Sequence, residues 1–159
     1  MLVKMVTLTG GGGGTITELI PTMTSNTTPN TGECHLWARE SASYDAFKAF
    51  DNNSTIQAGH STHQGHNWFA YKFATAPKAD FAIFIPSVNG TVYIDGSDDF
   101  VDWQSMGNFT TLSETQTVEA GKVYYFPLST NKTWQTYRAY LSTSGTGAGC
   151  YYFQLFKVE

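Results

Sequence analysis

Residues 46–55 read Ala-Phe-Lys-Ala-Phe-Asp-Asn-Asn-Ser-Thr, and they decide the fold. Their first half, with Ser43 as an N-cap just before it, predicts a single turn of helix. Their second half is an oxygen-rich loop. The next apolar stretch, residues 67–73 (Asn-Trp-Phe-Ala-Tyr-Lys-Phe), alternates in the manner of a half-buried strand. A lone helical turn that leads into strands predicts a β-protein with almost no helix.

Short apolar runs recur along the chain at the spacing of a β-sandwich. Asn89-Gly90 lies between two of them and predicts a type I′ hairpin. Seven strands and one helical turn together predict an all-β, antiparallel β-sandwich of the jelly-roll kind. The predicted strands are residues 34–42, 67–74, 80–86, 91–95, 122–128, 136–142 and 150–158.

The composition limits the class of partner. The chain has 159 residues, of which 15% are aromatic and only 14% charged, and it is rich in Thr, Ser, Asn and Gly. This mixture is typical of extracellular or virion β-proteins. The net charge of −4 argues against a nucleic acid or an anionic membrane as partner. A neutral polar ligand fits better.

Residues 1–20 are expected to form a separate attachment segment, followed by one domain over residues 21–159. The segment begins with an apolar run, which Lys4 interrupts, and continues with five consecutive glycines at residues 10–14, which predict a hinge. The run is too short for a signal-peptide core or a membrane span. We therefore expect a protein that is made without a signal peptide and does not insert into a membrane.

Cys34 and Cys150 leave two alternatives open. A disulfide between them would close most of the chain into a loop and contribute about 4–5 kcal/mol. Two buried free thiols are the other alternative, and synthesis in the cytoplasm favours them.

Five segments, taken in order, resemble the discoidin-like (coagulation factor 5/8 type C) family, which includes the family 32 carbohydrate-binding modules. The resemblance covers roughly residues 20 to 159. It implies a galactose-binding-domain-like sandwich that binds carbohydrate and does not catalyse a reaction. The segments are residues 46–55, 67–73, 94–99 with Trp103, 137–141 and 151–156.

The resemblance also implies a structural calcium ion, because many family members wrap calcium with an Asp-Gly-x-x-x-Thr loop and an acid from the last strand. This sequence departs from that pattern: Asn52 replaces the glycine, the loop is one residue shorter, and an amide replaces the last acid. The alternative is a tight Asx-type turn without metal. The implied ligands are Lys48, Asp51, Asn53, Thr55 and Gln154.

The family's ligand-binding end maps onto Tyr44 and onto the loop that carries His60, His63 and His66. Imidazoles at that end can form hydrogen bonds with sugar hydroxyls. The spacing of three also suggests zinc, but neither a Cys nor an acid completes a site within the loop. A surface loop without a role is the third alternative.

Tryptophans carry sugar affinity because a pyranose ring packs its C–H face on a flat aromatic ring. Trp134 lies in a polar stretch, residues 129–135, where packing does not readily explain it, so we count it as a ligand-binding candidate. Trp68 and Trp103 match structural positions of the family and are expected to pack. Trp37 can face either way.

Enzyme motifs are missing from the sequence. It contains no Gly-x-Ser-x-Gly elbow, and the glycines at residues 10–14 lack the Gly-Lys-Ser/Thr of a phosphate loop. Asp95, Asp98, Asp99 and Asp102 cluster in what reads as a solvated turn, and no pair of acids is placed for glycoside hydrolysis. We expect no catalysis.

Two functions remain. The first is an adhesin that recognises cell-surface glycans, such as a bacteriophage tail-fibre tip, located on the virion or extracellular surface. Its N-terminal segment would contact other virion or fibre subunits, and fibre tips are commonly trimers. The second is a structural virion protein, such as a capsid decoration, that uses the sandwich only as a scaffold.

Overall fold

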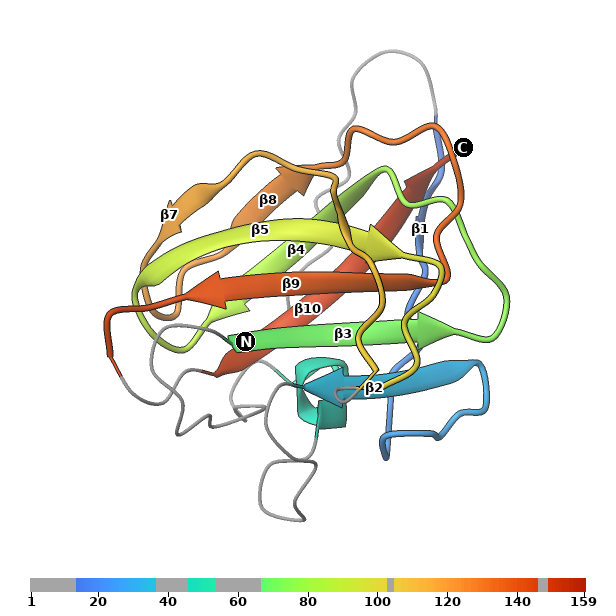
Figure 1. Cartoon of the computed structure of the whole chain (residues 1–159), viewed down its shortest axis with the longest axis horizontal. Coiled ribbons are helices and arrows are strands. Elements are labelled where there is room, and N and C mark those ends of the chain that lie inside the picture. Colours follow the sequence, from blue (N-terminus) through green and yellow to red (C-terminus); the bar gives the residue numbers. More distant parts are fainter. Residues whose placement is uncertain (1–13, 37–45, 54–66, 103–104, 146–148) are drawn as a thin grey trace.

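The computed structural model describes residues 14–36, 46–53, 67–102, 105–145 and 149–159. It is a sandwich of two antiparallel sheets with one 3-10 turn, which confirms the predicted all-β class (Figure 1). Within the described ranges, no helix is long and apolar enough to cross a membrane. The elements are β1 (Ile16–Glu18), β2 (Gly32–Leu36), η1 (Ala46–Ala49), β3 (Asn67–Phe73), β4 (Phe81–Pro86), β5 (Gly90–Ser97), β6 (Thr110–Thr111), β7 (Gln116–Val118), β8 (Tyr124–Pro127), β9 (Thr136–Ser142) and β10 (Cys150–Val158).

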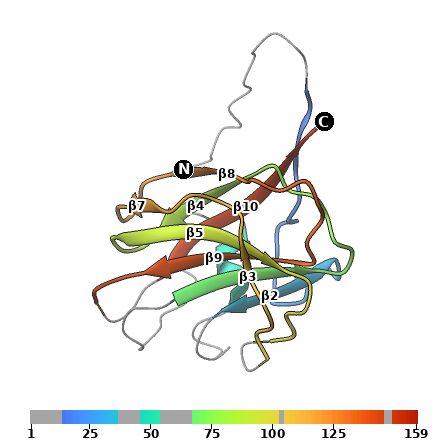
Figure 2. The ribbon, with the colours of Figure 1, turned by 45° about the horizontal axis from the view of Figure 1, so that its top comes forward.

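The two sheets differ in size. The smaller has four strands in the order β1-β10-β4-β8, and the larger has six, with β2-β3-β9-β5-β6 in a row and β7 paired to β5. The two layers are visible when the molecule is tilted (Figure 2). Every pairing between named strands is antiparallel. Strands that follow each other in the sequence often belong to different sheets, as expected of a jelly-roll.

The hairpin predicted at Asn89-Gly90 is wrong. β4 and β5 flank this dipeptide but lie in different sheets, so the chain crosses between layers here. Gly90 is needed for another reason: a Cβ on it would collide with the carbonyl oxygen of Ser142 on β9. Asn89 accepts a hydrogen bond from Ala120 N at 2.9 Å, which ties the crossing to the loop after β7.

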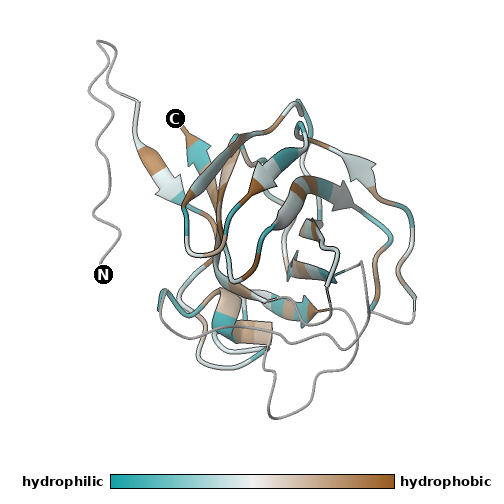
Figure 3. Cartoon of the chain, turned by 90° about the vertical axis from the view of Figure 1, so that its left-hand side faces the viewer, coloured by the Kyte–Doolittle hydropathy of each residue, from teal (hydrophilic) through white to brown (hydrophobic). Residues whose placement is uncertain are grey.

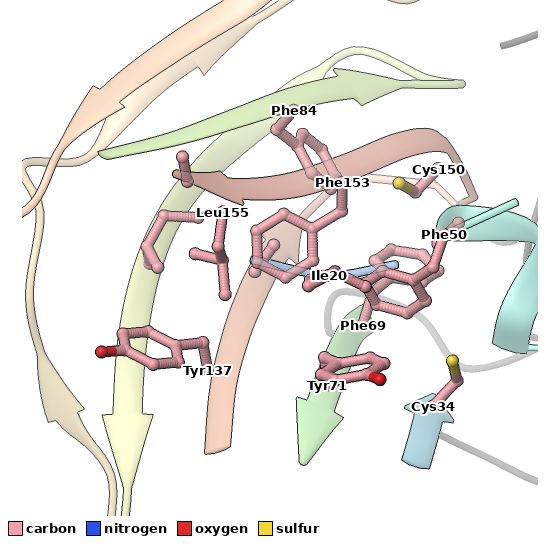
Figure 4. Close-up of a cluster of buried hydrophobic side chains, with 14 of the residues drawn as sticks. Ile20, Cys34, Phe50, Phe69, Tyr71, Phe84, Tyr137, Cys150, Phe153 and Leu155 are labelled. Carbon is pink, nitrogen blue, oxygen red and sulfur yellow. The ribbon is translucent and has the colours of Figure 1, made fainter. Parts of the chain in front are cut away.

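Aromatic side chains fill the space between the sheets (Figure 4). Phe69 of β3 packs on Phe84 of β4, which in turn meets Phe153 of β10 edge-on at 6.1 Å between ring centroids. Phe50, just after η1, packs against both Phe153 and Tyr71. Figure 3 colours the strands by hydropathy and shows hydrophobic residues in both sheets. Burial of these large rings is the main favourable term in folding.

The start of the chain is part of the sandwich from residue 15 onward. β1 pairs with β10, with Ile16 opposite Val158, and Thr15 and Glu159 exchange two backbone hydrogen bonds of 2.9 Å. Residues 15–20, which the sequence assigns to the attachment segment, therefore belong to the folded domain. Residues 1–13 lie outside the described residues.

Both cysteines are buried, and the structure has no disulfide between them. Cys34 belongs to β2 in the larger sheet and Cys150 to β10 in the smaller one (Figure 4). Burial raises the pKa of the Cys150 thiol well above its ordinary value, so it stays protonated and behaves as a small hydrophobic group. Of the two alternatives, the structure has buried thiols that are not bridged.

A buried ion pair lies on the outer face of the larger sheet. Arg138 of β9 donates from Nε to Asp95 Oδ1 at 2.9 Å and from Nη2 to Asp95 Oδ2 at 2.5 Å. The guanidinium also lies 3.7 Å from the ring centroid of Phe109. Burial raises the pKa of the Asp95 carboxyl, and the Arg138 guanidinium opposes that shift. Asp95 is therefore not part of the solvated acidic turn predicted from the sequence. It is buried, and β5 extends past it to Ser97.

Arg138→Met should lower the free energy of unfolding by about 3–5 kcal/mol, because it leaves a buried carboxylate without its partner. The double variant Asp95→Leu/Arg138→Met removes both charges and should recover most of that loss. Urea unfolding followed by tryptophan fluorescence measures both variants. A double variant no more stable than Arg138→Met would contradict this interpretation.

Candidate functional site

The pairing of β3 with β9 defines two ends of the sandwich. At one end Asn67 lies opposite Leu141, and at the other Lys72 lies opposite Thr136. We call the first the loop end, because the histidine loop enters β3 there, directly before Asn67. We call the second the Glu159 end, because β1 and the last residue of β10 lie on that side (Figure 1).

The predicted ligand-binding residues do not all belong to one end. Tyr44, His60, His63 and His66 lie outside the described residues, but the histidine loop connects to the loop end. Trp134 lies at the Glu159 end, where its backbone N donates to Pro77 O. Five residue steps along β3, from Asn67 to Lys72, separate the two ends by about 17 Å. Trp134 therefore lies at the opposite end from the point where the histidine loop joins β3.

Asn67 is the notable described side chain at the loop end, and the sequence alone did not indicate it. It is only 2% exposed, yet neither its Oδ1 nor its Nδ2 finds a hydrogen-bond partner among the described residues. It shares the inward side of β3 with Phe69 and Tyr71, at the edge of the core. Leaving a buried polar group unpaired costs about 1–3 kcal/mol, so the position needs an explanation other than stability.

The Asp51 loop is an ordered Asx turn. Asn53 N donates to Asp51 Oδ1 at 2.8 Å, and Asn52 adopts a φ of 58°. This left-handed conformation favours glycine and is tolerated by asparagine, so Asn52 suits the turn. Burial raises the pKa of Asp51, while the Asn53 N–H and the nearby Lys48 oppose the shift. A half-buried carboxylate is therefore available in the turn.

Gln154 has another role than the one the resemblance implies. Its Oε1 accepts from Ile20 N at 3.0 Å and from Leu155 N at 2.9 Å, and its Nε2 donates to Ile20 O at 2.8 Å. The Gln154 amide thus ties Ile20, just after β1, to β10. Its oxygen already accepts two hydrogen bonds. In the parts of the chain that the structure describes, no three His, Cys, Asp or Glu residues form a group that can hold a metal. Thr55 lies outside those parts, so calcium remains a prediction centred on Asp51.

Trp134 packs more than its polar surroundings suggest. It is 8% exposed and belongs to the main core. Its ring packs closely against Gly96, where an added Cβ would come within 2.8 Å of the indole Cγ and Cδ2. Lys132 Nζ lies 3.5 Å from the ring centroid on the indole face. The sequence prediction that packing does not explain Trp134 is thus wrong for most of the ring.

A shallow, open hollow of about 500 Å³ lies beside this ring. We call it the Trp134 hollow. Apart from Trp134 and Leu112, its lining is hydroxyl, amide and ammonium groups. Sequence reasoning missed most of these residues, because threonines and serines are scattered through the whole chain. The lining residues are Thr110, Thr111, Leu112, Ser129, Thr130, Asn131, Lys132 and Trp134.

The other tryptophans fit the sequence predictions where the structure describes them. Trp68 is buried and meets Phe100 edge-on at 5.8 Å between centroids, so it packs as expected. Trp37 and Trp103 lie outside the described residues.

Comparison with models of protein families and with curated protein sequences finds no match. Comparison with solved structures finds carbohydrate-binding modules. The family 32 module of Clostridium perfringens NanJ, in complex with galactose, superposes with a TM-score of 0.67 at 13% identity, over 90% of this chain and 100% of that one. Chitosan-binding module 1 of a chitosanase/glucanase from Paenibacillus sp. IK-5 gives 0.64 at 18% identity, over 80% and 96%.

A second module of the Paenibacillus enzyme, in complex with chitotriose, gives a TM-score of 0.58 at 17% identity, over 80% of this chain and 95% of that one. The match also includes a Ruminococcus gnavus GH29 fucosidase, but only over 27% of that enzyme. The chain therefore has the β-sandwich fold of the family 32 carbohydrate-binding modules.

Calcium should raise the melting temperature of the parent protein but not that of Asp51→Asn. The asparagine keeps an oxygen for the Asn53 N–H but lacks the charge that calcium needs, and a ligand stabilises only the form that binds it. In chelator at neutral pH the variant should be at least as stable as the parent, because a raised pKa means that folding disfavours the ionised carboxylate. Calorimetry in calcium and in chelator measures this. If the parent melts at the same temperature in calcium and in chelator, the Asp51 loop is a turn that binds no calcium.

Proposed function

We propose that this chain is a non-catalytic carbohydrate-binding module whose ligand binds at the loop end. The observation that carries the proposal is the buried, unpartnered amide of Asn67 at the end where the histidine loop enters β3. The fold shared with sugar-binding modules supports it. So does the net charge of −4, which suits a neutral ligand better than an anionic one.

The chemistry of the loop end suits sugar hydroxyls. A hydroxyl both donates and accepts hydrogen bonds, and the Asn67 amide offers a carbonyl oxygen and an NH₂ group to match. His60, His63 and His66 would supply further donors and acceptors. Tyr44 would pack against the C–H face of the ring. The histidines and Tyr44 enter this proposal from the sequence.

Pairing of the acids supports a binding role without catalysis. A glycosidase needs two carboxylates facing each other across the substrate. In the described part of the chain, Asp95 pairs with Arg138, Asp98 with Lys132 and Asp80 with Lys78. Asp99 accepts hydrogen bonds from Asn108.

The finer proposal is an adhesin, in particular a bacteriophage receptor-binding or tail-fibre tip protein that recognises cell-surface glycans. Its support is the Thr- and Asn-rich composition and the glycine run that would connect the sandwich to residues 1–9. Those residues would contact other virion subunits, in a trimer if the fibre is trimeric. The competing function is a capsid decoration that binds no glycan.

A glycan array separates these functions. The parent protein should bind a subset of the glycans, and the triple variant His60→Ala/His63→Ala/His66→Ala should bind them weaker by about 1–3 kcal/mol at unchanged melting temperature. A silent array would favour the capsid decoration. If the folded triple variant binds as well as the parent, the ligand does not bind at the histidine loop.

Asn67→Leu tests ligand binding at the loop end through a residue that the structure describes. Leucine has nearly the same shape and removes the unpaired amide, so it should raise the free energy of unfolding by about 1–2 kcal/mol. It should also weaken glycan binding at least tenfold. Thermal unfolding and array binding together measure this. A variant that is less stable than the parent and binds equally well would assign Asn67 a structural role.

A further inference from the structure

We infer that the Trp134 hollow is a second sugar-binding site, at the opposite end of the sandwich from the loop end. This goes beyond the proposed function, because it assigns a separate site and stands even if the loop end binds nothing. It takes a neutral pyranose ring. Four features of the hollow lead to this inference.

First, the Trp134 ring is held in place before any ligand arrives. The ring packs against Gly96 so closely that no Cβ would fit there, and the indole Nε1 donates to Thr130 Oγ1 at 3.1 Å. Thr130 is itself fixed, since its Oγ1 accepts from Lys132 N at 3.3 Å. A fixed aromatic plane loses little conformational entropy on binding, which is what a stacking site needs.

Second, the ring contacts a side chain that is easy to displace. Lys132 Nζ lies 3.5 Å from the ring centroid, but its side chain is 51% exposed and is held by an ion pair with Asp98, itself 52% exposed. An exposed pair of this kind contributes only about 0–1 kcal/mol. The Lys132 ammonium can therefore leave the ring face for a sugar at small cost, whereas a packed apolar side chain could not.

Third, the rim offers the groups that sugar hydroxyls need. Thr110, Thr111 and Ser129 are exposed and place hydroxyls around the hollow, and Asn131 adds an exposed amide. Leu112 and Trp134 supply the apolar part of the lining. An apolar surface with a few polar groups at its edge is typical of small-ligand sites, and about 500 Å³ is within their usual size.

Fourth, the local charges select a neutral ligand. The Lys132 ammonium lies 2.8 Å from Asp98 Oδ2, and this hydrogen bond lowers the pKa of Asp98 and keeps its carboxylate ionised. The two charges offset each other beside the hollow. An acidic sugar would have to compete with Asp98 for the ammonium, and a cationic one would face Lys132.

Two sites about 17 Å apart would let one domain bridge two sugars on a glycan surface. Each site can then be weak while attachment to a dense surface is strong, because the second contact forms at high effective concentration. This gives the second site a physical role even at millimolar affinity.

NMR titration of the full ¹⁵N-labelled chain tests the inference, with two neutral sugars, galactose and GalNAc-β-1,3-galactose, as the probes. The indole Nε1–H signal of Trp134 reports on the hollow, and the side-chain amide of Asn67 reports on the loop end. The Trp134 signal should move saturably with at least one probe. Trp134→Phe identifies that signal by removing it.

Thr111→Val should weaken the titration at the hollow by about 3–10-fold, because it removes a rim hydroxyl from an exposed strand position. Thr117→Val is the matched control: Thr117 is also exposed and also pairs with β5, on β7, but does not line the hollow. It should leave the titration unchanged. Equal effects of the two variants would overturn the assignment.

The two reporters separate the proposals. Movement of the Asn67 signal alone would overturn the second site and leave the proposed function intact. Movement of the Trp134 signal alone would support the second site and overturn the loop end. If neither signal moves with either probe up to molar sugar, both sites are overturned.

Discussion

The antiparallel register of β3 against β9 is the constraint on which the rest of the structure depends. It sets Asn67 opposite Leu141 and Lys72 opposite Thr136, and so decides which loops meet at each end of the sandwich. The same two strands alternate their side chains, with Phe69 in the core and Arg138 on the outer face. A slip of one residue would bury the charge in the main core and expose the aromatic ring. The ion pair with Asp95 across β9 and β5 opposes such a slip.

Much of the fold could be predicted because its long strands alternate. β3, β9 and β10 match their predicted ranges within one residue, since seven to nine residues give period two enough repeats to be recognised. β1, β6 and β7 have only two or three residues each and were not predictable. They form because a neighbouring strand offers an open edge, which is a property of the fold and not of their own residues. The hairpin predicted at Asn89-Gly90 is wrong for a related reason. A tight turn and a close approach of the backbone to β9 both favour glycine, so the residue type does not distinguish them.

The candidate sites show where residue type stops being informative. Gln154 and Trp134 were chosen for chemistry they possess, but the fold uses the amide to hold Ile20 and most of the indole to cover Gly96. Asn67 gives no signal in the sequence, because an unpaired amide is visible only once its neighbours are known. Asn52 is a different case, because its residue type departs from the glycine of the resembling loop. Its φ of 58° shows that asparagine adopts the left-handed conformation at this position. The residue types thus indicated the turn at Asp51, while hydrogen-bond partners had to come from the structure.

Saturation-transfer difference NMR with chitotriose tests non-catalytic sugar binding most directly, because one sample reports contact and bond cleavage together. Irradiation of the protein's aromatic protons should transfer saturation to ring C–H protons of the sugar. The trisaccharide should remain intact over days, since Asp80, Asp95 and Asp98 are paired with basic side chains. The same experiment is repeated with galactose to cover a different sugar type. Absence of transfer to both sugars, or the appearance of new reducing-end signals, would contradict non-catalytic carbohydrate binding.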